Sequence, residues 1–255
     1  VSISDKIETL ISIFISGKRP SGSSDPYALR RNLNGVILII WQFELNLEIE
    51  NIFNELFEYW SISLPNLKFE KEKVLIDLIE FTNQRIVSHL EELLIGKDII
   101  KAVCLFNFSS EKRIMNILDL KNRIKTINQL KEKSNFSEIQ KVISRVSKLA
   151  EKGNLKLTIF THKDHINPKL FEKECEIKVF ELIKQLEKIS SLPNWDYFKL
   201  FNLFETNANY LNELFDNEKG VLIMAEDAEI RNNRLNLLGL VRNYSLKIAD
   251  FTELN

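Results

Sequence analysis

The sequence predicts an all-α protein built as a helical bundle. Apolar residues recur at intervals of three and four along most of the chain. The 7 glycines and 5 prolines fall almost entirely between these periodic segments, where helices are expected to end. Almost no stretch alternates with the period of a strand, apart from residues 155–159, and residues 221–224 are too short to build a sheet.

In the first half of the chain, the predicted helices follow one another with short breaks. The first begins near Ile3 and is closed by Gly17. Asp25 followed by Pro26 is typical of an N-cap and first helical turn, so the second helix should run from there to about Phe43. Further helices are predicted over residues 46–60, 71–94 and 98–105.

From Ser109 onward the predicted helices are longer and more charged. They cover residues 110–133, 135–152, 169–190, 194–215 and 226–248. Residues 154–170 mix both periodicities and include a proline, so they are expected to form an irregular crossover. The longest apolar run, residues 36–41, is far shorter than the roughly 20 residues that a membrane helix needs.

The composition is that of a globular protein. The chain has 255 residues, of which 44% are hydrophobic and 28% charged. Its net charge of −1 supplies no bulk field toward nucleic acid or an anionic membrane, so any such affinity needs a local patch. Cys104 and Cys175 lack a metal-ligand pattern and fit a reducing cytoplasm better than a disulfide framework. Because it begins with Val1, the chain is interpreted as part of something longer or as lacking its natural start.

Charge is unevenly distributed along the chain. Residues 41–92 hold 11 acidic and 4 basic side chains, whereas residues 121–148 hold 8 basic and 2 acidic ones. Within the basic region, steps of four, three and four residues place several cations along one helical stripe beside an apolar face. The cations are Lys141, Arg145, Lys148 and Lys152. Such a helix could dock on a core and contact RNA phosphates, although a solvated lysine face has the same pattern.

Residues 17–35, GKRPSGSSDPYALRRNLNG, concentrate glycine, proline and basic side chains. A Walker phosphate loop is excluded, because Ser23 stands where the lysine should be and no strand precedes it. A helix N-terminus flanked by cations could still contact a phosphate. The possible contacts are Lys18, Arg19, Arg30 and Arg31. A structural turn before a capped helix explains the same residues more simply.

No catalytic or metal site stands out. His162, Asp164 and His165 suggest a metal, but a further ligand at suitable reach is missing. The sequence has no Gly-x-Ser-x-Gly elbow, Cys/His pair or isolated carboxylate pair. We therefore expect no catalytic residue and no metal.

Residues 224–238, MAEDAEIRNNRLNLL, predict a helix with acids in its first turn, where the helix dipole favours them. Three arginines follow: Arg231, Arg234 and Arg242. They could reach RNA, or they could pair with the acids of their own helix or with Asp250. Both interpretations stay open at this level.

Three stretches together resemble the bacterial glycyl-tRNA synthetase beta subunit family, in its C-terminal part. They are GKRPSGSSDPYALRR, MAEDAEIRNNRLNLL and the ending KIADFTEL at residues 247–254. Weaker similarities between them extend the resemblance over nearly the whole chain. One departure concerns the basic stripe: relatives tend to carry Lys-Arg-Val-x-Asn-Ile where this chain has SRVSKL at residues 144–149. Contacts there cannot be transferred from relatives.

The resemblance implies a cytoplasmic heterotetramer of two alpha and two beta chains. The alpha subunit would activate glycine with ATP and Mg²⁺, and the beta subunit would bind tRNA(Gly). Residues 1–43 would be the C-terminal end of an HD-like helical region, and residues 75–255 would form a DALR-like anticodon-binding domain, as in arginyl-tRNA synthetase. Residues 44–74 would be a helical segment that connects the two. This region would bind no cofactor itself and would contact neither membrane nor DNA.

The sequence therefore predicts a non-catalytic region that positions tRNA(Gly) for aminoacylation at the alpha subunit. The predicted RNA contacts are Lys141, Arg145, Lys148, Arg231, Arg234 and Arg242. One alternative is a helical module that docks the ligase subunits with little RNA contact, which the acidic region 41–92 would suit. Another is a remnant HD-type phosphohydrolase, for which the His-Asp ligands are missing and for which Asp5 gives no support.

Overall fold

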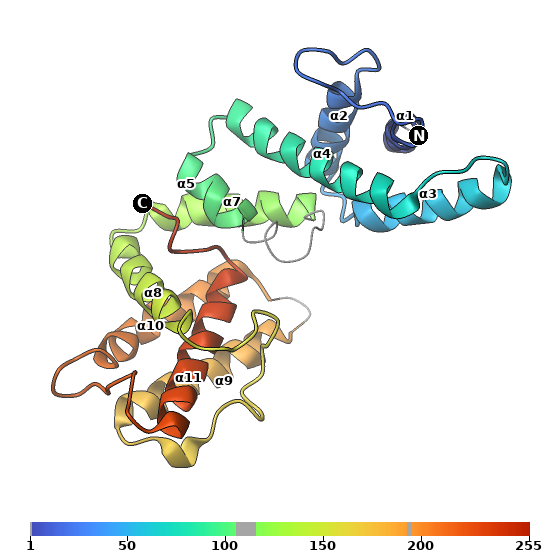
Figure 1. The fold of residues 1–255 in the computed structure, drawn as a ribbon. Coiled ribbons are helices and arrows are strands. Elements are labelled where there is room, and N and C mark those ends of the chain that lie inside the picture. The colour runs from blue at the N-terminus through green and yellow to red at the C-terminus, as the bar shows by residue number, and fades with distance from the viewer. Residues whose placement is uncertain (1, 106–115, 193–194) are drawn as a thin grey trace. The chain divides into compact units, whose positions relative to one another are not determined.

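A computed structural model describes residues 2–105, 116–192 and 195–255, and over these residues the protein is all-α, as predicted (Figure 1). The chain divides into two compact units, Val1–Ile124 (unit 1) and Lys125–Asn255 (unit 2). The division falls inside one helix, α7 (Ile117–Lys131). Each unit is described by itself below.

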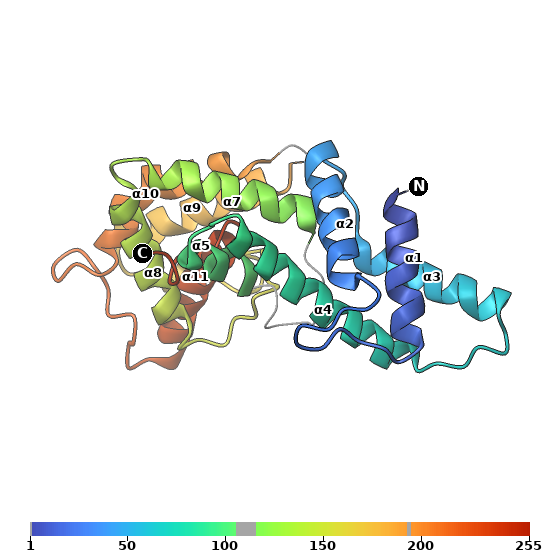
Figure 2. The same ribbon diagram turned by 90° about the horizontal axis from the view of Figure 1, so that it is seen from above.

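Unit 1 consists of helices that follow the predicted order closely. They are α1 (Ser2–Ile15), α2 (Leu29–Phe43), α3 (Ile49–Ser63), α4 (Lys71–Glu92), α5 (Lys97–Ile100) and the first half of α7 (Ile117–Lys131). Helix α1 lies beside α2, as Figure 2 shows, and both pack on α4. The buried residues of α1 are Ile7, Leu10, Ile11 and Phe14, whose spacing of three and four gives one apolar stripe toward the core.

The start of α2 differs from the prediction. Residues 25–28 form a turn, in which the Ala28 N–H donates to the Asp25 carbonyl and Ala28 is left-handed (φ 53°). The helix therefore begins at Leu29 instead of near Pro26. Ala28 takes the N-cap position that was predicted for Asp25, but the Asp25 carboxylate still accepts the N–H groups of Leu29 (2.8 Å) and Arg30 (3.0 Å).

Two other predicted helices of this half change form or length. The predicted helix over residues 98–105 is the short α5 followed by a π-helical turn, Lys101–Leu105. The predicted helix over residues 110–133 is present as α7 from Ile117. Its expected first residues, up to 115, lie outside the described residues.

Beyond the second half of α7, the longer helices described in unit 2 form one cluster (Figure 1). They are α8 (Phe136–Ala150), α9 (Glu174–Ser190), α10 (Tyr197–Glu213) and α11 (Ala228–Leu246). Helix α11 packs on α8 and α9, and α10 packs on the same two. The starts of α10 and α11 fall later than predicted because Asp196 and Asp227 are their N-caps. Helix α9 begins at Glu174 because a 3-10 turn, Pro168–Leu170, precedes it.

The predicted irregular crossover is confirmed, since residues 154–167 form neither helix nor strand. Helix α11 holds this segment by side chains. Asn243 donates to the carbonyls of Lys156 and Ile159, both at 2.8 Å. Gly239 lets α11 come close to it, because a Cβ there would stand 2.9 Å from the Leu155 Cδ2 atom.

The compact units do not coincide with the predicted domains. The predicted boundary at residue 75 falls inside α4, whereas the structure divides the chain at residues 124 and 125. The assignment of an HD-like end and a DALR-like domain remains a prediction.

Candidate nucleic-acid interface

Helix α8 is amphipathic, with one face in the core of unit 2 and the other in solvent. Its buried residues include Val142, Ile143 and Val146. Lys141, Arg145 and Lys148 are exposed, as is Lys152 just beyond the end of the helix. The structure thus brings the predicted stripe together on one face, which we call the α8 cationic face (Lys141, Arg145 and Lys148). Whether it contacts RNA remains a prediction.

The buried side of α8 is fixed by the C-terminal segment of the chain. The Gln140 side chain donates to the carbonyls of Phe251 (2.9 Å) and Leu254 (3.0 Å), and the Ser144 hydroxyl donates to Phe251 at 2.7 Å. The Phe251 ring packs near Phe136 and Phe201. These contacts fix the orientation of α8, and with it the α8 cationic face, within unit 2.

One member of the α8 cationic face lies on an aromatic ring. The guanidinium carbon of Arg145 stands 4.2 Å from the centre of the Phe215 ring, which follows α10. Among the described residues, no carboxylate lies within ion-pair distance of Lys141, Arg145 or Lys148. Their positive charges are consequently left for an external anion.

Other cations of the basic region are already paired within the fold. Lys133 contacts Glu205 at 2.7 Å, and Asn135 donates to the same carboxylate. These hydrogen bonds hold the pKa of Glu205 below its ordinary value. Lys121 donates to the Trp41 carbonyl, and Arg123 is buried. The number of basic side chains that are free to bind a ligand is therefore smaller than the excess of basic residues counted in the sequence of this region.

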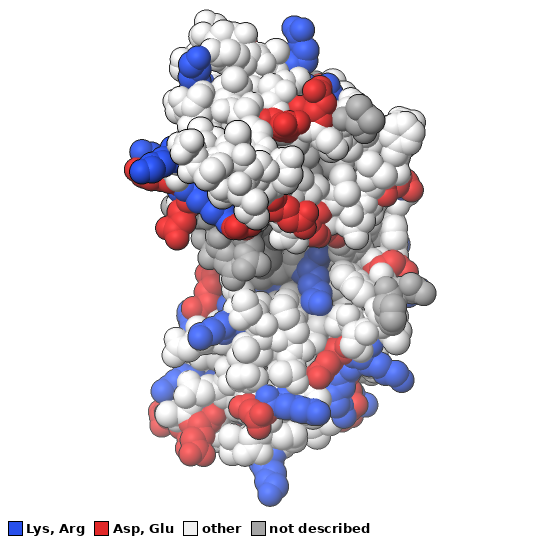
Figure 3. Space-filling view, turned by 90° about the vertical axis from the view of Figure 1, so that its right-hand side faces the viewer, with Lys and Arg blue, Asp and Glu red and all other residues white. Residues whose placement is uncertain are grey.

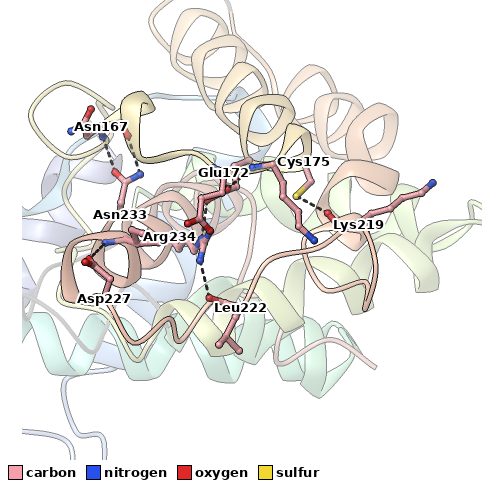
Figure 4. Close-up of polar contacts among 11 residues, drawn as sticks. Asn167, Glu172, Cys175, Lys219, Leu222, Asp227, Asn233 and Arg234 are labelled. Atoms are coloured by element: carbon pink, nitrogen blue, oxygen red, sulfur yellow. Dashed lines mark hydrogen bonds and ion pairs between the residues drawn. The ribbon is translucent and has the colours of Figure 1, made fainter.

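Arg234 lies inside unit 2 and does not reach its surface. Its side chain is 3% exposed, and Figure 4 shows it directed toward α9. Its Nε–H donates to Glu176 at 2.9 Å, and its two terminal nitrogens donate to Glu172 (2.6 Å) and the Leu222 carbonyl (3.1 Å). Because these bonds occupy the guanidinium, Arg234 is not available to RNA in this structure.

Arg242 and Arg231 also serve the fold. Arg242 is buried and donates to the Leu155 carbonyl at 2.9 Å and to Asn243. Half-buried Arg231 donates to the carbonyls of Ala225 (2.8 Å) and Glu226 (3.1 Å). Pairing with the acids of their own helix or with Asp250, one of the two interpretations left open by the sequence, is not observed among the described contacts. Their partners are backbone carbonyls and Asn243, while Arg234 binds acids at the start of α9.

The chain is similar to a described family and to several curated proteins. The family model "Glycyl-tRNA synthetase beta subunit" matches residues 1–105. The glycine–tRNA ligase beta subunit of Acaryochloris marina is 34% identical over 98% of this chain and 35% of its own length. The corresponding proteins of Trichodesmium erythraeum and Clostridioides difficile are 33% and 30% identical, over 100% of this chain and 36% and 34% of their lengths.

The chain belongs to the glycyl-tRNA synthetase beta subunit family. It spans about a third of the length of the curated relatives it matches.

The glycine-rich stretch that resembles this family, residues 17–31, has a structural role in unit 1. Arg19 contacts Asp77 at 2.6 Å and lies 4.1 Å from the Phe14 ring centre. Lys18 donates to the Tyr27 hydroxyl. The Asp25 carboxylate already occupies the N-terminus of α2, where a phosphate would otherwise bind. Phosphate contact by Lys18, Arg19, Arg30 and Arg31 stays an untested prediction, and it is weakest for the paired Arg19.

The histidines of residues 162–165 do not converge with other ligands. The Nδ1 atom of His162 lies 2.6 Å from Glu187, which also accepts the Thr161 hydroxyl. Over the described residues, no group of three His, Cys, Asp or Glu side chains is placed to hold a metal ion.

On the face drawn in Figure 3, basic and acidic side chains are scattered among uncharged ones. None of the described helices is both long and apolar enough to cross a bilayer.

Sequence reasoning missed Phe215, since only the packing of α10 against α8 brings this ring to Arg145.

Proposed function

We propose that this chain binds tRNA(Gly) as part of the beta subunit of glycyl-tRNA synthetase. It would hold the tRNA so that the acceptor end reaches the alpha subunit, which would bind glycine, ATP and Mg²⁺ in the cytoplasm. Holding a substrate in a productive position lowers the entropic part of a barrier without any catalytic side chain. This chain would thus contribute binding and orientation to aminoacylation.

The observation that carries the proposal is the α8 cationic face, in a chain related throughout to glycine–tRNA ligase beta subunits. Its cations are exposed, lie on one face and have no carboxylate partner among the described residues. Cations that neutralise phosphates release counterions, so their contribution to affinity falls as salt rises. The buried contacts of α8 fix the helix in unit 2 and thereby the positions from which these side chains extend.

The experiment is a salt series of tRNA binding, with the chain at full length and tRNA(Gly) compared with an unrelated tRNA. The variant Lys141→Ala/Arg145→Ala/Lys148→Ala removes the whole face. We expect weaker binding and a log–log salt slope reduced by about 2 to 3, since each phosphate contact contributes roughly 0.7 to 0.9.

A matched control keeps the change in net charge the same. Lys163, Lys169 and Lys188 are exposed elsewhere in unit 2, and their triple alanine variant should bind like the unaltered chain. Equal loss in both variants would mean that only net charge matters. No preference for tRNA(Gly), or no salt slope, would overturn the proposed function.

A docking role for unit 1 is the second candidate, favoured by an apolar groove between α1 and α3. The groove has a volume of about 630 Å³. Its apolar lining residues are Ile3, Ile7, Leu47, Ile52, Leu56 and Tyr59. Tyr59 is 63% exposed, and the nearby Ile62 is 80% exposed. If this face binds the alpha subunit, Tyr59→Ser should weaken subunit association measured by calorimetry and leave tRNA binding unchanged.

A further inference from the structure

We propose that Arg145 and Phe215 form a stacking site for one unpaired RNA base, with Lys141 and Lys148 binding phosphates on either side of it. This inference rests on the proposed tRNA-binding function and names the kind of RNA that the α8 cationic face takes. A stacking site would select unpaired nucleotides, whereas a charged face alone would attract any RNA.

The geometry of Arg145 distinguishes it from its neighbours. Its guanidinium lies over the Phe215 ring at 4.2 Å, so the ring limits where the planar group can lie. Arg145 is nevertheless exposed, so the part of its surface not covered by Phe215 is open to a ligand. A guanidinium plane is one of the surfaces on which proteins stack splayed-out RNA bases.

The other cation–ring contacts of unit 2 lack this property. Among its described residues they involve lysines, such as Lys133 over Phe201 and Lys184 over Phe180. An ammonium group is a point charge and offers no flat surface, whereas a guanidinium does. The Arg145–Phe215 pair is therefore suited to a base, and the lysines beside it are suited to phosphates.

Lys141 and Lys148 lie about one helical turn before and after Arg145. At a rise of 1.5 Å per residue, they are displaced along the axis by roughly 6 Å and 4.5 Å. They can therefore contact the backbone on both sides of a base that rests on Arg145. The carboxylate nearest in sequence to Phe215, Asp216, accepts the N–H groups of Glu218 (2.8 Å) and Lys219 (2.9 Å) and is thus engaged by its own turn.

An unpaired strand fits this arrangement better than a duplex. In A-form RNA the bases are stacked on one another, and side chains meet mainly phosphates and 2′-hydroxyls. Stacking of one base on a protein platform affects binding by about 5- to 150-fold. That contribution would be absent for a fully paired probe.

The test uses the full-length chain and two RNA probes of equal length. One is a stem-loop with 2-aminopurine in an unpaired loop, and the other is a perfect duplex. The informative variant is Arg145→Lys, which keeps the positive charge and removes the flat group. We expect it to bind the stem-loop about tenfold more weakly, with an unchanged salt slope and a smaller change in 2-aminopurine fluorescence on binding, and to bind the duplex as before.

Changes at the ring provide an independent check. Phe215→Tyr keeps the ring and should retain stem-loop binding, whereas Phe215→Leu should lose it to the same extent as Arg145→Lys. Far-ultraviolet circular dichroism establishes that each variant is folded.

The failures can be told apart. If Arg145→Lys binds the stem-loop normally while the triple alanine variant loses salt-dependent binding, the stacking site is wrong and the proposed function stands. If Arg145→Lys weakens both probes equally, the side chain serves phosphates only and the stacking site is again wrong. If the unaltered chain binds neither probe nor tRNA(Gly), the proposed function itself fails.

Discussion

The Nε–H of Arg234 donates to a carboxylate oxygen of Glu176 at 2.9 Å, and the two side chains are 3% and 0% exposed. The other oxygen of the Glu176 carboxylate accepts the N–H groups of Glu172 (2.8 Å) and Lys173 (3.1 Å) at the start of α9. One buried carboxylate thus caps α9 and anchors α11 to it. A charge so placed is tolerated because it is fully paired and hydrogen-bonded.

Removing the partner of this carboxylate should strongly destabilise unit 2. Arg234→Ala leaves Glu176 buried and without its cation, and breaking such a pair costs about 3 to 5 kcal/mol. Urea-induced unfolding followed by circular dichroism measures the loss. The control is Arg231→Ala on the same helix, whose half-buried side chain binds carbonyls and should cost only about 1 kcal/mol. Equal effects of the two substitutions would contradict the structural role of Arg234.

Asp25→Ala should lower the stability of unit 1 by about 1 kcal/mol. The substitution removes the acceptor of the Leu29 and Arg30 N–H groups, which is the usual cost of losing an N-cap. Trp41 and Trp60 report on this unit when Trp195 is replaced by Phe, so fluorescence follows its unfolding alone. Asp25→Asn keeps one acceptor oxygen and should cost less than alanine. A larger cost for Asn would rule out capping as the cause.

The Glu187 carboxyl should make stability depend on pH in the acid range. Burial would raise the pKa of Glu187, but hydrogen bonds from His162 outweigh burial and hold this pKa below the ordinary 4.5. The folded chain therefore binds fewer protons here than the unfolded chain, so stability rises with pH in this window. The contribution is complete above pH 4.5 and is lost as pH falls through the lower folded pKa.

Glu187→Gln isolates this effect, because glutamine cannot titrate. The difference in unfolding free energy between the unaltered chain and Glu187→Gln should shrink as the solution is acidified below pH 4.5. A difference that stays constant over that range would show that the carboxyl is not coupled to folding.

Neither cysteine should react with thiol reagents while the chain is folded. Burial raises the pKa of Cys104 to about 12, and burial likewise raises the pKa of Cys175. Since the thiolate is the reactive form, modification near neutral pH should wait for unfolding. An exposed thiol introduced by Ser63→Cys should react at once and so serves as the positive control. Rapid labelling of the native chain without that substitution would contradict the burial of both residues.

Local signals in the sequence predicted most of the helices and the buried and exposed faces of α8. The three- and four-residue spacing of Val142, Ile143 and Val146 predicts their burial, and the same spacing predicts that Lys141 and Arg145 lie outside. Asp25 was predicted as the N-cap of α2; its carboxylate does accept the first helical N–H groups, although Ala28 holds the N-cap position. The turn between Asp25 and the helix was not predicted, because Asp-Pro suits a turn as well as a helix start.

The arginines of α11 could not be placed from their own helix. Their partners lie far away in the chain: Glu176 is 58 residues from Arg234, and the Leu155 carbonyl is 87 residues from Arg242. One signal was available, since leucines at residues 235, 237, 238 and 240 surround the helix instead of marking one stripe. A helix that is apolar all round is buried, and arginines inside it need internal partners.

Helix α8 separates residues that hold the fold from residues that the fold does not need. On one side Gln140 and Ser144 bind the backbone of residues 251–254, and a change there disturbs the core of the unit. On the other side Lys141, Arg145 and Lys148 stand in solvent, so replacing them costs the fold little. The exposed face of α8 can therefore be substituted while the bundle that carries it is kept.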